Sequence, residues 1–380
     1  MDFDLSEEHL LFQRMIRDFV SKEIEPLAER WDETNEFPYD IIAKMADLGL
    51  FAVHYPEAHG GSGDELTFVI AVEEISRGSG GLGAIFLASV GLAMYPITLF
   101  ANEAQKSNYI SRVIKGNIAA FGLTEAAAGS DVSALTTRYV KKDDHFILNG
   151  NKIFITNGGE ADFVTAFATS DRSLGYRGIS AFIIEKGTPG FSVGKLERKM
   201  GIHPASAAEL IFDDCKVPAE NLIAEEGKGF KIAMGAFDAS RVSVAAQAVG
   251  IAQAAYEKAV DYAKERQQFG TAIARLQAIQ WMIADMATEI DAARLLTYRA
   301  AWQTGKEGHA PLKEAAMAKL FASEASHRVC HKALQIFGGY GYVKDFPLER
   351  YARDQRITEI YEGTSEMQRW TIARQILGVK

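Results

Sequence analysis

Residues 335–369 read QIFGGYGYVKDFPLERYARDQRITEIYEGTSEMQR, and this stretch guides the interpretation of the whole chain. It contains a glycine cluster, an arginine-rich segment opened by a proline, and Glu362 between Tyr361 and Gly363. Glycines let a backbone approach a flat ring or a phosphate closely, and a carboxylate beside an aromatic residue can lose part of its hydration. The stretch therefore suits proton abstraction beside a large cofactor, although an exposed glutamate near a helix start would give the same pattern.

The composition is that of a globular protein with sizeable cores. The chain has 380 residues, of which 48% are hydrophobic, and a net charge of -9. This length allows two or three domains, and the absence of a basic stripe argues against nucleic acid as the main partner. Cys215 and Cys330 are the only cysteines, so we expect buried structural thiols, no disulfide and no metal site.

The N-terminal segment, MDFDLSEEHL, is acidic, and the first basic residue is Arg14. It has neither the apolar core of a signal peptide nor the Arg/Ser-rich pattern of a transit peptide. We identify no apolar run of membrane-spanning length and expect no membrane insertion. We therefore expect a cytoplasmic protein, or a mitochondrial matrix protein if a transit peptide has been removed.

Helical periodicity dominates both ends of the chain, and β-type patterns dominate its middle. GSGGLG at residues 78–83 matches a dinucleotide fingerprint only formally, because a helix-periodic segment and not a strand precedes it. FILNGNKIFI at residues 146–155 predicts a β-hairpin that turns at Asn149-Gly150. Further short strands are expected at residues 163–168, 179–185 and 209–213, and long helices at residues 241–267, 276–303 and 311–337.

These patterns predict an α+β protein that is mainly α and has three domains. We expect an N-terminal helical domain at residues 1–118, a small middle β-domain at residues 119–226, and a C-terminal four-helix-bundle domain at residues 227–380. Alanine-rich faces in the last domain, such as Ala245, Ala246 and Ala248, permit the close helix packing of a bundle.

Four more stretches carry candidate chemistry. FGLTEAAAGSDVSAL at residues 121–135 lets a backbone follow a cofactor, with hydroxyls available as donors. FIT at residues 154–156 ends the β-rich run, although strands are often rich in aromatic residues and threonine. Arg266 in ERQQFG suits a pyrophosphate, although the helix macrodipole also favours an arginine at a helix end. Asp238 and Arg241 are an acid and a base three residues apart, which a capping ion pair would also explain.

Taken in order, these motifs resemble the acyl-CoA dehydrogenase family of flavoenzymes over the whole chain. TEAAAGSD is similar to the family's first flavin signature, with Ala126 where the family usually has proline. FIT, ERQQFG, QIFGG and IYEGT are similar to its later motifs. MDFDLS, ERQQFG and ITEIYEGTSEMQR look most like the short-chain (butyryl-CoA) and bacterial branches.

The resemblance implies FAD as cofactor and a set of contact residues. Phe154 would lie against the isoalloxazine ring, Thr156 would bond near flavin N5, and QIFGG would wrap the adenosine end. The full set of expected cofactor contacts is Phe121, Leu123, Thr124, Gly129, Ser130, Phe154, Ile155, Thr156, Arg266, Phe269, Gln277, Gln335, Ile336, Phe337, Gly338, Gly339, Thr364, Ser365 and Glu366. The expected substrate contacts are Ser130, Asp238, Arg241 and Gly363.

The implied reaction is α,β-dehydrogenation of a short-chain acyl-CoA to the trans-2-enoyl-CoA, with Glu362 as the base and electron transfer flavoprotein as the electron acceptor. Some relatives place the base at the position of Ser240, which leaves Glu362 without an obvious competitor here. Arg266 and Gln277 would reach the FAD of a neighbouring subunit in a homotetramer.

Several alternatives stay open at this point. The substrate can be a branched, cyclic or dicarboxylic acyl-CoA with the same mechanism. An acyl-CoA oxidase and a flavin monooxygenase share the fold, but oxidases are typically longer and monooxygenases generally lack the glutamate of YEG. A catalytically silent FAD-binding or scaffold protein would keep Glu362 and Arg266 for structure alone.

Overall fold

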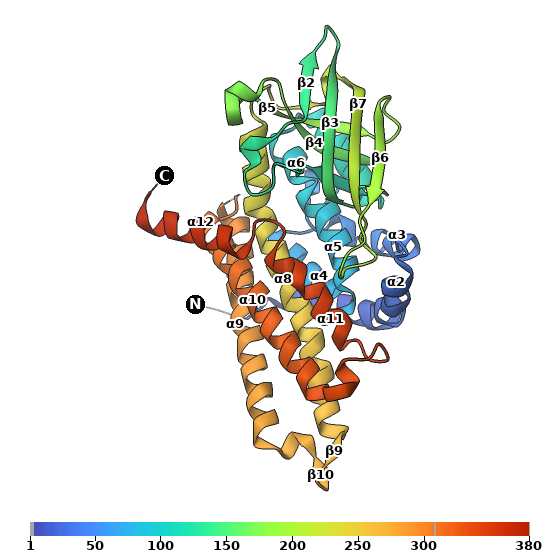
Figure 1. Cartoon of the computed structure of the whole chain (residues 1–380), viewed down its shortest axis with the longest axis vertical. Helices are drawn as coiled ribbons and strands as arrows, with labels where there is room; N and C mark the ends of the chain where they lie inside the picture. Colours follow the sequence, from blue (N-terminus) through green and yellow to red (C-terminus); the bar gives the residue numbers. More distant parts are fainter. Residues whose placement is uncertain (1–3, 308, 380) are drawn as a thin grey trace.

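The computed structural model describes residues 4–307 and 309–379, and it has helices at both ends of the chain and a β-sheet in the middle (Figure 1). The sheet lies at one end of the molecule, and three long helices run side by side away from it. These helices are α8 (Gly229–Glu265), α9 (Gln277–Glu307) and α10 (Leu312–Phe337). The predicted fold class, mainly α with a small middle sheet, is confirmed.

The N-terminal helices begin at side-chain caps that the sequence supplies. The Ser6 hydroxyl accepts a hydrogen bond from the His9 N–H at the start of α1, and Asp64 accepts one from the Thr67 N–H at the start of α4. The helices of this part are α1 (Glu7–Phe19), α2 (Ala28–Thr34), α3 (Tyr39–Asp47), α4 (Glu65–Gly78), α5 (Gly80–Phe86), α6 (Tyr95–Phe100) and α7 (Glu103–Ile114).

Residues 80–100 correct one sequence expectation. This 21-residue segment, with a mean hydropathy of 1.8, is long and apolar enough to cross a membrane by composition alone. In the structure it forms α5, a π-helical stretch at Leu87–Leu92 and α6, and 89% of its most apolar window is buried inside the molecule. The segment is therefore mostly a core element that protein surrounds, which explains its composition.

The middle of the chain forms an eight-stranded sheet. The strand order is β6-β7-β3-β2-β4-β5-β8, and β1 pairs in parallel with β4. The strands are β1 (Ala119–Gly122), β2 (Arg138–Lys141), β3 (His145–Thr156), β4 (Phe163–Thr169), β5 (Ile179–Glu185), β6 (Phe191–Leu196), β7 (Ala207–Pro218) and β8 (Leu222–Ile223).

The predicted hairpin at Asn149-Gly150 is wrong. Both residues lie inside β3, a single strand of 12 residues, and the chain turns earlier, where the Lys142 N–H donates to the His145 carbonyl. The pairing register of β3 with β7 shifts between Leu148 and Gly150, so Asn-Gly here marks a bulge. Glycine is needed because its φ is 143° and an added Cβ would lie 2.6 Å from the Thr137 hydroxyl.

Helix α8 starts at Gly229, twelve residues before the predicted start at residue 241. Gly229 and Gly235 lower the helix propensity of this first part, and packing against the sheet compensates. An added Cβ at Gly229 would lie 2.7 Å from the backbone of Ser180 in β5. The remaining elements are the hairpin β9 (Gln267–Gln268) and β10 (Thr271–Ala272), followed later by α11 (Leu348–Gln355) and α12 (Ser365–Leu377).

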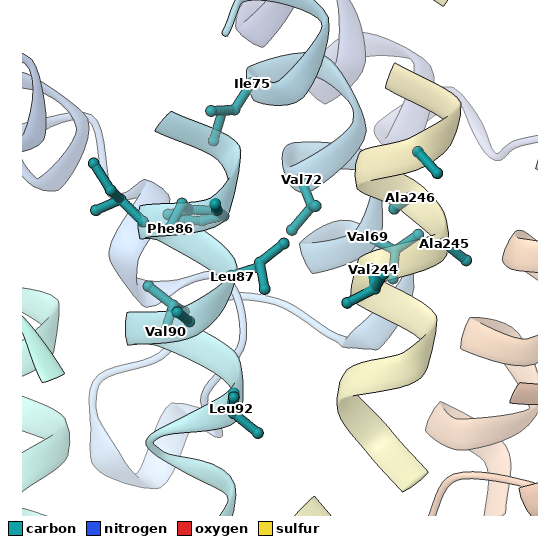
Figure 2. Packing of buried hydrophobic residues seen from close by; sticks show 14 of the residues in the cluster. Val69, Val72, Ile75, Phe86, Leu87, Val90, Leu92, Val244, Ala245 and Ala246 are labelled. Carbon is teal, nitrogen blue, oxygen red and sulfur yellow. The ribbon is translucent and has the colours of Figure 1, made fainter. Parts of the chain in front are cut away.

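The main core lies where α4, α5 and α8 cross (Figure 2). Val72 of α4 extends toward Leu87, and Val69 of α4 lies beside Val244 of α8. The small alanines of α8 at this crossing are fully buried, as their pattern predicted, and they allow the helix axes to come close. At Gly250 the approach is so tight that an added Cβ would lie 2.2 Å from the Glu73 carbonyl oxygen.

We expect Gly250→Ala to lower the unfolding temperature markedly. The extra methyl overpacks the crossing of α4 and α8, which typically costs about 1–3 kcal/mol. Gly305→Ala in α9 is the matched control, because among the described residues nothing lies within 4 Å of its added Cβ. Alanine there should be neutral or stabilising, since it favours a helix over glycine by about 0.5–1 kcal/mol. Calorimetric unfolding of both variants checks this, and equal midpoints for Gly250→Ala and wild type would contradict it.

Candidate active site

Glu362 lies on a tight turn immediately before α12. Its φ is 54° and that of Gly363 is 88°, so two successive residues adopt the left-handed conformation. This conformation is unfavourable for a glutamate and free of strain only for the glycine. Thr364 then caps α12 by accepting from the Met367 N–H. The surrounding structure must therefore hold Glu362 in place, which is common at functional sites.

The Glu362 carboxylate is anchored by α8. Its Oε2 accepts a hydrogen bond of 2.8 Å from the Ser240 hydroxyl, at the position where some relatives carry the base. Burial raises the pKa of Glu362, and the Ser240 hydrogen bond and the charges of Lys319 and Arg241 oppose this rise. The net effect is a more basic carboxylate than one in water.

The aromatic neighbour of Glu362 is also tied to α8. The Tyr361 hydroxyl donates to Gln247 Oε1, and Gln247 Nε2 donates to the Gly80 carbonyl at 2.9 Å. Gln247 is fully buried, so this chain of hydrogen bonds links the turn to α5 through the core. The position of the carboxylate is thus coupled to the packing of α8 against α5.

Asp238 and Arg241 form the expected pair, with Arg241 Nη1 donating to Asp238 Oδ1 at 2.8 Å. Arg241 is 9% exposed and its Nε has no hydrogen-bond partner. Burial lowers the pKa of Arg241 and raises that of Asp238, which are the directions expected when charges leave water. The pair lies one helical turn or less from Ser240, which places it beside Glu362.

Lys319 and Gln368 belong to this site, and the sequence analysis missed both. Each is fully buried, and each donates to the Gly363 carbonyl oxygen at 2.8 Å. Lys319 stands on the apolar face of α10 among Ala315, Ala318 and Ala322. A lysine on an alanine face was the available signal, because a buried charge always needs a partner.

Residues of the first flavin-like motif lie beside the end of β3. The Thr124 carbonyl accepts from the Ile153 N–H at 2.9 Å, which ties the loop to the strand. Gly129 and Ser130 are exposed, and Thr124 is half-buried. Phe121 is buried against Phe237 of α8, with ring centroids 5.6 Å apart.

The β3 end presents Phe154 to solvent. A register shift with β7 between Lys152 and Ile155 gives Phe154 a φ of 59° and leaves it 61% exposed. A bulge that turns a large ring outward is typical of a site that receives a ligand. Thr156 is half-buried, whereas Ile155 and Leu123 point into the cores, so these two offer a cofactor little but backbone atoms.

A buried ion pair supports this loop. Lys152 Nζ lies 2.7 Å from Glu125 Oε1 and donates to the Leu123 carbonyl at 3.2 Å. Burial raises the pKa of Glu125, but the Lys152 charge and hydrogen bonds from Thr136 and Thr137 outweigh it and bring the pKa to about 2. Burial lowers the pKa of Lys152 to about 8, so the pair is ionised at neutral pH.

The other expected cofactor residues gather at the far end of the bundle. Arg266 follows α8 directly, its guanidinium 5.6 Å from the Tyr340 ring centroid. Phe337 at the end of α10 stacks on Tyr262, with centroids 4.0 Å apart. A surface hollow of about 690 Å³ lies here, which we call the distal pocket; the expected residues among its lining are Arg266, Phe269, Ile336, Phe337, Gly338 and Gly339. Gln277 and Gln335 are close in sequence to these lining residues, and both are exposed. Phe269 is 91% exposed.

The two groups of expected cofactor residues are far apart within one chain. Gly229 at the start of α8 touches the sheet, and Arg266 follows its end (Figure 1). At about 1.5 Å per residue, the 37 residues of α8 span about 55 Å. The sheet-side group meets α8 at Phe237, and the 29 residues from there to Arg266 span about 44 Å, so the two groups lie well apart within one chain.

The remaining expected contacts lie on α12. Ser365 is buried and its hydroxyl has no hydrogen-bond partner, while Glu366 is exposed. An orphaned buried hydroxyl calls for a ligand or a water. The Ser365 hydroxyl is therefore available to a polar group of a ligand.

Lys152→Met should destabilise the protein by about 3–5 kcal/mol, because it leaves Glu125 as an unpaired buried charge. Glu125→Gln alone should also destabilise, but the double variant should lose less than the sum of the two. Chemical unfolding of wild type, both single variants and the double variant closes this cycle. Strictly additive losses would show that the two side chains do not interact.

Comparison with known proteins assigns the chain to one family. Models of the N-terminal, middle and C-terminal domains of acyl-CoA dehydrogenases match residues 6–117, 120–215 and 227–377. A short-chain specific acyl-CoA dehydrogenase of Clostridium acetobutylicum is 48% identical over 379 residues, which cover 99% of this chain and 100% of that protein.

Two solved structures are similar over nearly the full length. Butyryl-CoA dehydrogenase from Megasphaera elsdenii has a TM-score of 0.97 and 45% identity, covering 99% of this chain and 100% of that one. A chain from a structural study of the electron transferring flavoprotein of Acidaminococcus fermentans has a TM-score of 0.97 and 49% identity, with the same coverage. The protein therefore belongs to the acyl-CoA dehydrogenase family of flavoprotein oxidoreductases.

Proposed function

We propose that this protein removes one hydrogen from the α carbon and one from the β carbon of a short-chain acyl-CoA thioester, giving the trans-2-enoyl-CoA. The observation that carries the proposal is Glu362, a carboxylate on a left-handed turn whose pKa burial raises. The α-proton of a thioester is weakly acidic, so its removal needs a base stronger than an ordinary carboxylate. The two short-chain relatives support the substrate class.

Glu362 takes the α-proton on its carboxylate and also assists through its backbone. Among the described residues, its N–H donates to no other group, which leaves it available to the thioester carbonyl. A preorganised donor at that oxygen stabilises the negative charge that develops as the proton leaves. Base and donor then belong to one residue, whose left-handed φ fixes both.

The neighbouring α8 residues hold the substrate beside this base. Ser240 orients the carboxylate, and Asp238 and Arg241 line the site with Gly363. Phe237, one turn before Ser240 on α8, is half-buried and its ring packs on Phe121, so apolar surface is available to an acyl chain. Exclusion of water from this surface strengthens every electrostatic contact of Glu362.

FAD is the cofactor that these residues fit. Thr124, Ser130, Phe154 and Thr156 would hold it on the sheet side, and the orphaned Ser365 hydroxyl gives a further donor. When bound, FAD accepts the β-hydrogen together with its electron pair. The side chains around it orient the substrate and keep water out.

We also propose a homotetramer, and the separation of the two groups of cofactor residues supports assembly with another copy. Because about 44 Å of α8 lies between Phe237 and Arg266, we expect Arg266 of one chain to serve the FAD of another. Apolar side chains exposed on α9 and α12 offer contact surface for other copies: Trp281, Leu295, Trp302, Trp370 and Ile376. A cofactor shared between subunits couples assembly to function.

Electron transfer flavoprotein is the proposed electron acceptor, supported by the relative from the study of the Acidaminococcus fermentans protein. The cytoplasmic location remains a prediction. Comparing butyryl-, octanoyl-, isovaleryl- and cyclic acyl-CoA in one flavin-bleaching assay tests the acyl preference, and we expect butyryl-CoA to react fastest.

Glu362→Gln should abolish flavin bleaching by butyryl-CoA while FAD and thioester still bind. Glutamine keeps the shape but has no basic carboxylate, and loss of a general base typically costs about 10²–10⁴-fold. Anaerobic stopped-flow spectroscopy gives the rate, and titration of the visible spectrum gives the binding. Glu57→Gln, an exposed glutamate in the N-terminal part, is the control and should react like wild type. A Glu362→Gln rate near that of wild type would exclude Glu362 as the base.

Arg266→Ala should lower the FAD content of the purified protein without loss of the helical fold. The variant removes the guanidinium that would pair with the pyrophosphate of a neighbouring subunit's cofactor. The ratio of flavin to protein absorbance measures the FAD occupancy, and light scattering measures the mass of the assembly. The control is Lys264→Ala, which removes an exposed cation two residues earlier. A fully active monomer with one FAD per chain would refute the shared site.

A further inference from the structure

Two buried side chains converge on one backbone oxygen next to the base. Lys319 Nζ and Gln368 Nε2 each lie 2.8 Å from the Gly363 carbonyl oxygen, and Gln368 also donates to the Glu362 carbonyl at 3.2 Å. Both side chains are fully buried. They come from different helices, α10 and α12, so together they clamp the turn from two sides.

The turn needs such a clamp. A left-handed φ at Glu362 is disfavoured by its Cβ, and the turn relaxes unless other contacts hold it. A neutral donor such as Gln368 would suffice to hold a carbonyl. A fully buried lysine is a costly choice for the same task, because its charge must leave water.

The charge of Lys319 therefore points to a second task. Burial lowers the pKa of Lys319 to about 8, while Glu362 raises it, which reflects attraction between the two groups. In the opposite direction, Lys319 lowers the pKa of Glu362 against the effect of burial. The other charged groups that act on this lysine are Arg241 on α8 and the carboxylates of Glu359 and Glu366.

Arg241 cannot replace this charge. Its guanidinium is paired with Asp238 at 2.8 Å, so part of its field is cancelled locally. Lys319 donates to a neutral carbonyl, so its full positive charge acts on the turn. Of the two cations near Glu362, Lys319 is the one bonded to the base's own loop.

We propose that Lys319 is a positioning residue for the dehydrogenation: it holds the Gly363 carbonyl so that Glu362 keeps its left-handed turn, and its ammonium charge keeps the Glu362 carboxylate ionised in the buried site. The proposal rests on the proposed function, in which Glu362 is the base. It gives the two donors of the clamp different roles, since Gln368 supports the turn without charge.

The experiment uses FAD-loaded full-length protein and three variants. Lys319→Gln keeps a donor but removes the charge, Lys319→Met removes both, and Lys332→Met is the control. Lys332 lies on the same helix but pairs with Asp285 of α9 at 3.0 Å, away from the turn. The limiting rate of flavin bleaching by butyryl-CoA is measured from acidic to alkaline pH, together with the substrate concentration at half-saturation.

The sign of the pH effect follows from the charge. Glu362 must be ionised to act, so the rate rises with pH through its pKa. Removal of a nearby positive charge raises the pKa of a carboxyl group, so both Lys319 variants should need a higher pH, by about one unit. The rate deficit should be about tenfold below the midpoint and should shrink above it, with little change in half-saturation.

Hydrogen exchange of the peptide around residues 357–368 separates the two roles without any substrate. Lys319→Met should exchange faster there than wild type, whereas Lys319→Gln should stay close to it. An unchanged pH midpoint in Lys319→Gln, or unchanged exchange in Lys319→Met, overturns the proposal. If Lys319→Met does not fold, the midpoint of Lys319→Gln still decides. If butyryl-CoA bleaches no wild-type flavin, the proposed function fails on its own, and the exchange comparison still tests the clamp.

Discussion

Helix α8 crosses α4 at a point where only glycine fits, with the Glu73 carbonyl 2.2 Å from where a Cβ would stand at position 250. This close approach fixes the path of a helix that touches every part of the site. Its start packs on β5, Ser240 in its first third bonds the Glu362 carboxylate, and Gln247 links Tyr361 to α5. The base is therefore positioned both by its own turn and by contacts to a helix whose path the core fixes.

At the site, burial raises the pKa of Glu362, and nearby polar and charged groups lower it. Burial alone would favour a neutral Glu362. A direct salt bridge would stabilise the charged form most strongly, but it would make the carboxylate a weak base. The chain instead uses a hydroxyl, a paired arginine and a lysine bonded to a carbonyl, each of which stabilises the charge partially. The pKa of Glu362 stays raised, so the carboxylate is both ionisable and basic.

Sequence reasoning predicted the fold class correctly but misplaced elements whose form depends on residues far along the chain. The glycine clusters, YEG and FIT can be recognised from the sequence because each motif is a short run of neighbouring residues. Asn149-Gly150 misled because a bulge and a hairpin turn share the same requirement for unusual φ values, and only pairing with β7 distinguishes them. Residues 80–100 passed unnoticed as an apolar run because burial by protein and burial by lipid select the same composition. Lys319 was missed because its partner, the Gly363 carbonyl, is 44 residues away.

The length of α8 determines how far Arg266 and the distal pocket lie from the sheet. A shorter helix would bring Arg266 and the distal pocket close to the sheet, and one chain would then be able to enclose its own cofactor. With 37 residues the helix places them about 55 Å from its start. The same helix thus bonds the base through Ser240 near the sheet and places Arg266 at its far end. In the proposed function, the base and the residues that hold it therefore belong to one chain, while Arg266 serves the cofactor of a second copy.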